Sequence, residues 1–154
     1  MQERRVIFYA IESDFLSIAT KFIEKMYTVD ERVLLLCSTD DEVRQSDLAL
    51  WTFSRISFIP HGSQYSTRIE DAEFCHTWIS TLVDFYNDPV CLVHNGLNVL
   101  QDRSVIKFNS IIDIFDKGLL PTARKRAEAY RELQFLQQKL WLQKSEGGWD
   151  SGDW

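Results

Sequence analysis

The feature that most constrains this chain is the alternation, in its first third, of short apolar runs with segments of helical periodicity. Residues 6–11 and 33–37 are uninterrupted apolar runs of strand length, typical of strands buried on both faces of a parallel sheet. Between them lies a helical stripe of apolar side chains, formed by Phe15, Ile18, Ala19, Phe22, Ile23 and Met26. Thr39 and Glu42 then have the spacing of a capping box, which predicts a second helix running toward Trp51.

This order predicts an α/β protein with a Rossmann-like three-layer fold, in which helices lie on both faces of a mostly parallel central sheet. The 154 residues, of which 45% are hydrophobic, suit one domain with one sizeable core. We expect residues 1–144 to form this single α/β domain. Residues 145–154 are expected to form an acidic, tryptophan-containing tail with the composition of a flexible segment.

Further strands are expected at residues 56–59, 74–79, 90–94 and 111–115, although a helix competes with the strand at 74–79. The sequence Pro60-His61-Gly62 is expected to stop the first of these strands. The last long helix is expected to begin near Pro121 and to fade after residues 141–144. That prediction depends on a helical stripe formed by Ala129, Leu133, Leu136 and Leu140.

Composition excludes several classes of protein. No apolar run approaches the roughly 20 residues of a membrane-spanning helix, and the first residues lack the anatomy of a signal peptide. Three cysteines do not make a disulfide framework, and their odd number favours a reducing compartment. A cytoplasmic protein without membrane contact is therefore expected. The net charge of −6 argues against general nucleic-acid binding, because phosphate contacts require a basic surface.

A nucleotide-binding enzyme is the alternative that a Rossmann-like order suggests. A phosphate at the first strand-to-helix turn needs glycines, but this turn reads Ile11-Glu12-Ser13-Asp14 and carries two carboxylates instead. Four residues with metal-ligand chemistry lie on expected strands whose side chains alternate between faces: Cys75, His76, Cys91 and His94. We therefore expect no catalytic site, no metal and no cofactor. His61 is interpreted as a turn histidine that hydrogen-bonds to the backbone.

Two features point to contact with other proteins instead. Trp51 and Phe58 are large aromatic residues on either side of a helix-to-strand turn, with no catalytic group beside them. In the last helix, basic residues outnumber acidic ones, and Arg124, Glu128 and Arg131 share one face. That face is either a solvated surface with weak intrahelical ion pairs or a site for an acidic peptide. The sequence pattern alone does not favour one over the other.

Three segments together resemble the chi subunit of the bacterial DNA polymerase III holoenzyme. The first is the N-terminal strand with Phe8-Tyr9 and the second strand that ends at Cys37. The most specific is Leu50-Trp51 followed, after six residues, by Phe58-Ile59-Pro60-His61. The third is the pattern Arg-x-Arg-x-x-Ala-Tyr-Arg that ends at Arg131. The three segments occur in the family's order and span about residues 6–135, whereas the middle of the chain matches loosely.

The resemblance implies a non-catalytic replication adapter of the clamp-loader complex. One surface of such subunits binds the psi subunit, and another binds the acidic, hydrophobic C-terminal tail of the single-stranded-DNA-binding protein (SSB). By resemblance, the psi-type interface here comprises Trp51, Phe58 and Pro60. The SSB-tail site is expected to comprise Arg124, Lys125, Arg126, Tyr130 and Arg131.

This chain departs from the family's pattern at the tail site. Leu120 stands where a basic residue is usual, Ala127 where a tyrosine is usual, and Glu128 where a lysine is usual. The resemblance therefore implies a pocket that is either weakened or rebuilt from Lys117, Lys125 and Arg126. The tail that ends at Trp154 is acidic and aromatic, like the ligand expected for this site. It is expected either to occupy the site or to pack its tryptophans on the body of the domain.

Overall fold

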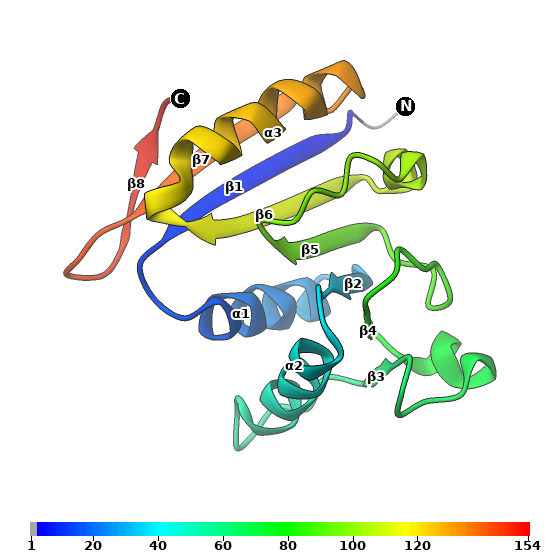
Figure 1. The fold of residues 1–154 in the computed structure, drawn as a ribbon. Coiled ribbons are helices and arrows are strands. Elements are labelled where there is room, and N and C mark those ends of the chain that lie inside the picture. Colours follow the sequence, from blue (N-terminus) through cyan, green and yellow to red (C-terminus); the bar gives the residue numbers. More distant parts are fainter. Residues whose placement is uncertain (1–2) are drawn as a thin grey trace.

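The computed structural model describes residues 3–154, and strands and helices alternate through most of this length (Figure 1). The strands are β1 (Arg5–Ile11), β2 (Val33–Leu36), β3 (His61–Ser63), β4 (Thr77–Ser80), β5 (Cys91–Asn95), β6 (Ser110–Asp116), β7 (Gln137–Gln143) and β8 (Trp149–Gly152). The α-helices are α1 (Phe15–Thr28), α2 (Asp40–Thr52) and α3 (Leu120–Glu132). Short 3-10 helices are η1 (Ile69–Phe74), η2 (Arg103–Lys107) and η3 (Lys117–Leu119).

The strands form one sheet in the order β3-β4-β2-β5-β6-β1-β7-β8. All neighbouring pairs are parallel except β7 and β8, which are antiparallel. Side chains of β1 alternate between two cores: Val6, Phe8 and Ala10 pack with α3, whereas Ile11 packs with α1 and α2. Figure 1 shows α3 on one side of the sheet and α1 and α2 on the other. The expected Rossmann-like α/β architecture is confirmed.

The first third of the chain follows the sequence pattern closely. Helix α1 begins after Asp14, whose carboxylate accepts a hydrogen bond from the Ser17 amide. Helix α2 begins after Thr39, whose hydroxyl accepts from the Glu42 amide. The Glu42 carboxylate reaches back to the amide and the hydroxyl of Ser38. Both helix starts are therefore stabilised by side chains that satisfy otherwise unpaired amides.

The strand predicted at residues 56–59 is wrong. Ser54 Oγ accepts hydrogen bonds from the amides of Ile56 and Ser57 and holds this segment in a turn. Ile56 is 96% exposed, and only Ile59 is buried. The strand begins at His61 instead, so the segment predicted to stop a strand contains the start of one.

The strand predicted at residues 74–79 is partly correct. Residues Ile69–Phe74 form η1, and the strand runs over Thr77–Ser80. The competing helical interpretation therefore describes the segment just before the strand. Strands predicted near 90–94 and 111–115 are confirmed as β5 and β6.

The predicted length of the last helix is wrong. Helix α3 ends at Glu132, and Gln134 adopts a positive φ of 71°. The amide of Phe135 bonds to the Tyr130 carbonyl and that of Gln134 to the Arg131 carbonyl, which is the Schellman arrangement. The chain then continues as β7, which pairs with β1 in parallel register. No glycine marks this helix end, so the local sequence carries no stop signal there.

The tail is a strand of the sheet and not a loose segment. Gly147 and Gly148 have φ values of 94° and 83°, which suit a tight turn between two strands. Strand β8 pairs with β7 through Gln143 opposite Trp149 and Leu140 opposite Gly152. No helix among residues 3–154 has both the length and the apolar character needed to cross a membrane.

Candidate protein-docking sites

An exposed cluster of aromatic side chains lies at the end of α2. Trp51 comes from the last turn of α2, Phe58 from the following turn, and His61 from the start of β3. The Trp51 ring centroid lies 5.1 Å from that of Phe58 and 5.0 Å from that of His61. We call Trp51, Phe58 and His61 the aromatic surface.

His61 holds the aromatic surface in place. Its Nδ1 lies 2.8 Å from the Ile59 carbonyl oxygen, so the interpretation as a turn histidine is confirmed. Its Nε2 lies 3.2 Å from Asp47 Oδ1 without hydrogen-bond geometry. Because the imidazole is bound between α2 and the start of β3, it positions the rings of Trp51 and Phe58 that pack against it.

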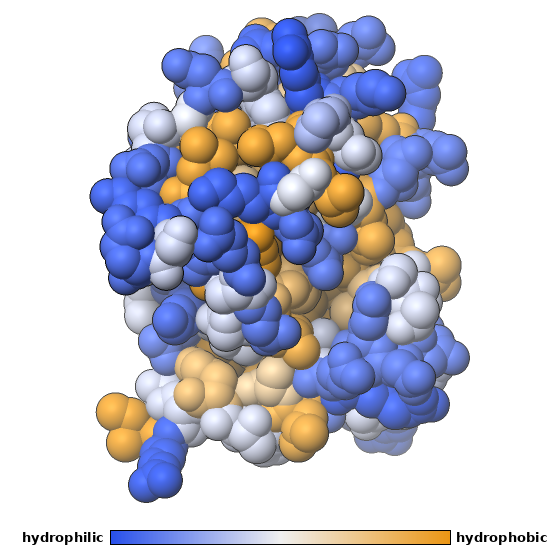
Figure 2. Space-filling view, turned by 60° about the vertical axis from the view of Figure 1, so that its left-hand side comes forward, coloured by the Kyte–Doolittle hydropathy of each residue, from blue (hydrophilic) through white to orange (hydrophobic). Residues whose placement is uncertain are grey.

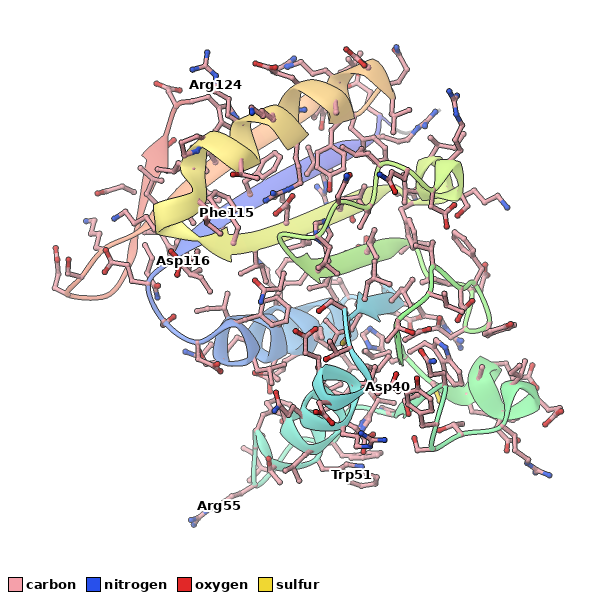
Figure 3. All side chains as sticks on the ribbon, viewed as in Figure 1. Asp40, Trp51, Arg55, Phe115, Asp116 and Arg124 are labelled. Carbon is pink, nitrogen blue, oxygen red and sulfur yellow. The ribbon has the colours of Figure 1, made fainter. Side chains whose placement is uncertain are left out.

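The two large aromatic rings face solvent despite these contacts. Trp51 is 57% exposed and Phe58 is 53% exposed, while Pro60 between Ile59 and His61 is half-buried. Figure 3 shows Trp51 pointing away from the sheet at the end of the molecule that holds α2. Figure 2 shows apolar side chains reaching the surface at this same end. An aromatic pair that is rigid but uncovered is typical of an interface anchor.

The basic residues of α3 do not form one surface. Arg126 is only 8% exposed, and its guanidinium makes a bidentate ion pair with Asp113 of β6, with N–O distances of 2.8 and 2.9 Å. Tyr130 is fully buried. Both side chains belong to the core between α3 and the sheet, so they present little surface to an SSB tail in this structure.

Arg126 and Tyr130 belong to a buried polar network that includes His94. The Leu97 amide donates to His94 Nδ1 at 2.9 Å, so Nε2 carries the proton that faces Tyr130 Oη at 2.9 Å. Burial lowers the pKa of His94 and so favours the neutral ring. Burial also raises the pKa of Tyr130, and the charge of Asp113 adds to the effect. The network is structural, since every member has a partner within the core.

The sequence contained one signal of this network. Asp113 is the only charged residue in the apolar run 111–115, and a carboxylate at the centre of a sheet needs a buried cation. The Arg-x-Arg pattern of the last helix supplies that cation at Arg126. Part of the family-like pattern thus stabilises the fold and does not bind a partner.

The exposed basic residues Arg124 and Lys125 line a pocket at the start of α3. Its lining is completed by Leu120, Pro121, Glu128, Asp153 and Trp154, and its volume is about 480 Å³. We call it the terminal pocket. Arg124 lies 3.9 Å from Glu128, and both side chains are largely exposed, so this ion pair is weak. Figure 3 shows Arg124 pointing outward near the C-terminal strand.

Two other predicted tail-site residues lie outside this pocket. Lys117 is turned toward the hairpin, where its Nζ donates to the Gln143 carbonyl at 2.9 Å. Arg131 is exposed but lies two helical turns beyond Arg124, roughly 10 Å along α3. Of the three residues suggested to rebuild the pocket, Lys125 alone lines it.

The first strand-to-helix turn is closed by a side chain from β7. Gln143 Oε1 accepts hydrogen bonds from the backbone amides of Glu12 and Ser13 at 2.7 and 3.1 Å. A nucleotide phosphate would need those same amides. No local sequence pattern indicates this contact, because Gln143 lies 131 residues away from Glu12 along the chain.

Comparison with protein families gives one match that spans most of this fold. The family model described as DNA polymerase III chi subunit, HolC, matches residues 3–141. This chain belongs to the DNA polymerase III chi subunit family. Chi subunits are non-catalytic accessory adapters of the clamp loader, so this chain has partners in the polymerase III holoenzyme. Comparison with curated proteins gives no match.

The family match has a clear relation to the two candidate sites. The aromatic surface and most of the terminal pocket lie within residues 3–141. Asp153 and Trp154, which line the same pocket, lie beyond the matched residues. The pocket of this chi subunit therefore combines residues within the family match with two residues that follow it.

Proposed function

We propose that this chi subunit links SSB to the clamp loader through two separate surfaces. The aromatic surface binds a psi-type subunit, with Trp51 and Phe58 as anchors and Pro60 beside them. The terminal pocket binds the acidic C-terminal tail of SSB through Arg124 and Lys125. The observation that carries the proposal is the packed but exposed Trp51–Phe58 pair.

Physical chemistry supports the aromatic surface as an interface. Burying two aromatic rings that are already held by His61 costs little conformational entropy. Other apolar side chains extend the surface, since Leu48 on α2 and Ile56 in the turn are also exposed. Monomeric proteins rarely leave a contiguous apolar patch uncovered without a partner.

Charge and shape support the terminal pocket as an anion site. Arg124 offers a planar guanidinium suited to carboxylates, and Lys125 adds a second positive charge. Leu120 and Pro121 supply an apolar wall. An acidic peptide has to displace Glu128 from Arg124, which costs little because that ion pair is exposed. Arg131 lies outside the pocket and could contact only a longer peptide.

The psi interface is tested by changing its anchors one at a time. We expect Trp51→Ala to weaken binding to the psi subunit of the same organism by about 2 kcal/mol, or roughly 30-fold, in calorimetry. Phe58→Ala should act in the same direction. Leu136→Ala is the matched control, because Leu136 is also exposed but lies next to β7. Equal binding by all three variants would contradict the proposed interface.

The tail site is tested with a synthetic peptide of the SSB C-terminus from the same organism. We expect Arg124→Glu to weaken peptide binding at least about tenfold, because a charge-assisted hydrogen bond becomes a repulsion. Arg103→Glu is the control, because it makes the same charge change on η2. This helix precedes the start of β6, whereas the terminal pocket lies near the other end of that strand. If both variants lose affinity equally, the effect comes from net charge and not from the pocket.

A further inference from the structure

The two tryptophans that follow the turn of the C-terminal hairpin, Trp149 and Trp154, lie on opposite faces of the sheet. Trp149 packs edge-on against Tyr9, with ring centroids 5.3 Å apart, on the face that holds α1. Trp154 packs edge-on against Phe8 at 4.8 Å and stacks on Phe115 at 6.3 Å, on the face that holds α3. The expectation that the tryptophans pack on the body of the domain is confirmed. Trp154 also forms part of the lining of the terminal pocket.

Trp154 covers an aromatic floor beside the basic side chains of α3. Phe8 and Phe115 are buried beneath it, and Arg124 and Lys125 lie in the lining of the same pocket. Without the Trp154 indole, the two phenylalanine rings would form an apolar depression with a basic rim. Such a depression fits an acidic peptide that carries a large apolar side chain.

The end of the chain has the chemistry of such a peptide. Asp150 and Asp153 provide negative charge, and Trp154 provides the large apolar group. Asp153 lines the pocket together with Arg124 and Lys125. Trp154 remains 37% exposed, so its hold on the pocket is incomplete. Asp153 and Trp154 thus lie beside Arg124 and Lys125 in the lining of this pocket, where an acidic peptide with an apolar side chain would bind.

The hairpin is also built to open at a small cost. Strand β8 has four residues, lies at the edge of the sheet and follows a turn with two glycines. Its side-chain ion pair, between Lys144 and Asp150 at 3.3 Å, is exposed to solvent. Short edge elements with few buried contacts open locally at free energies well below that of global unfolding.

We propose that residues 153–154 are an internal competitor for the SSB-tail site, with Trp154 occupying the position of the partner's apolar side chain. The inference rests on the proposed function of the terminal pocket. An SSB tail then binds only molecules in which Trp154 has left Phe8 and Phe115. The apparent affinity is reduced by the fraction of molecules that remain closed.

The test compares binding of the SSB-tail peptide to the full chain and to two tryptophan variants by fluorescence anisotropy. We expect Trp154→Ala to bind at least about threefold more tightly, as follows when two thirds or more of the molecules are closed. Trp149→Ala is the matched control, because this tryptophan packs on the other face of the sheet. Because Trp149 also holds β8 against Tyr9, this variant should tighten peptide binding less than Trp154→Ala does.

A second measurement keeps a tryptophan at position 154 and follows its ring directly. In protein labelled with fluorotryptophan, saturation with the peptide should move the Trp154 ¹⁹F resonance toward its solvent-exposed position and leave that of Trp149 in place. This experiment decides the question even if Trp154→Ala does not fold.

The outcomes separate the two proposals. Unchanged or weaker binding by a folded Trp154→Ala, or a Trp154 resonance that stays in place when the peptide binds, overturns internal competition but leaves the SSB-tail site intact. Failure of the full chain and of both variants to bind the peptide overturns the proposed tail site itself, and internal competition with it.

Discussion

Neighbouring basic residues of α3 have different roles. The role of each depends on whether its side chain faces solvent or the sheet. Arg124 and Lys125 reach solvent, whereas Arg126 turns inward to Asp113. The guanidinium of Arg126 also lies 5.7 Å from the centroid of the Phe115 ring, one of the two rings beneath Trp154. Arg126 thus packs on the aromatic floor beneath Trp154 without lining the terminal pocket.

The buried ion pair leads to a prediction about stability. We expect Arg126→Ala to lower the free energy of unfolding by about 3–5 kcal/mol in urea denaturation, because Asp113 is left as an unpaired buried charge. Lys125→Ala, at the neighbouring exposed position, should change it by no more than about 0.5 kcal/mol. Similar losses in both variants would contradict a special role for the buried pair.

His94 predicts a dependence of stability on pH. Burial lowers the pKa of His94 in the folded protein, the charge of Asp113 raises it, and the charge of Arg126 lowers it further. In the unfolded chain this pKa is about 6.5. Below that value the unfolded state binds a proton that the folded state does not. The free energy of unfolding should therefore fall as pH decreases below about 6.5, by up to about 1.4 kcal/mol per pH unit.

The measurement is urea denaturation at pH 7.5 and 5.5, with an NMR titration of the histidine rings. His76, whose pKa burial also lowers, adds to the slope. The decisive signal is the His94 ring, whose pKa burial lowers, so its titration midpoint should lie below the usual value of about 6.5. Protonation of His94 with a midpoint near 6.5 in the folded protein would contradict the prediction.

At the scale of elements, the boundary between α3 and β7 determines the architecture of the C-terminal third. Gln134 adopts a left-handed conformation and ends the helix, and Phe135 then packs on Tyr130 with ring centroids 5.9 Å apart. Because the helix stops there, residues 137–143 are free to pair with β1. The same boundary lets β8 add to the sheet and bring Trp154 back to α3.

This boundary predicts the effect of substitutions at Gln134. We expect Gln134→Val to lower the free energy of unfolding by about 1–2 kcal/mol, because a β-branched residue is strained at a positive φ. Gln134→Gly, which removes the strain, should be at least as stable as the unaltered protein. Thermal unfolding of both variants provides the measurement. A Val variant as stable as the Gly variant would show that the left-handed conformation is not required.

At the scale of the whole molecule, the two proposed sites lie at opposite edges of the sheet. Helix α2, which carries Trp51, packs on β3 and β4, whereas the terminal pocket lies beside β1 and β8. With neighbouring strands about 4.8 Å apart, an eight-stranded sheet separates its edges by roughly 30 Å. That separation is what an adapter between two large partners requires.

The geometry predicts simultaneous and independent binding. We expect the chi subunit, immobilised through a psi subunit, to bind the SSB-tail peptide with an affinity within about twofold of that of free chi. Surface plasmon resonance with and without psi measures this ratio. Mutually exclusive binding would place the two ligands on one surface and contradict the assignment of separate sites.

The sequence by itself determined the fold class and the first four elements, because apolar period and capping residues are local signals that tertiary contacts reinforced. It also identified Trp51 and Phe58, whose exposure the structure then established. The prediction of a strand at residues 56–59 was wrong because Ile56 and Phe58 are apolar residues that face solvent and do not pack against the core.

Only the tertiary structure decided the roles of the last 35 residues. The direction of Arg126 depends on Asp113, the end of α3 on a left-handed glutamine, and the place of the tail on pairing with β7. Each is a contact between positions that no local periodicity relates. The same glycines and acidic residues that resemble a flexible linker in the sequence form a hairpin, because a sheet edge was available to bind it.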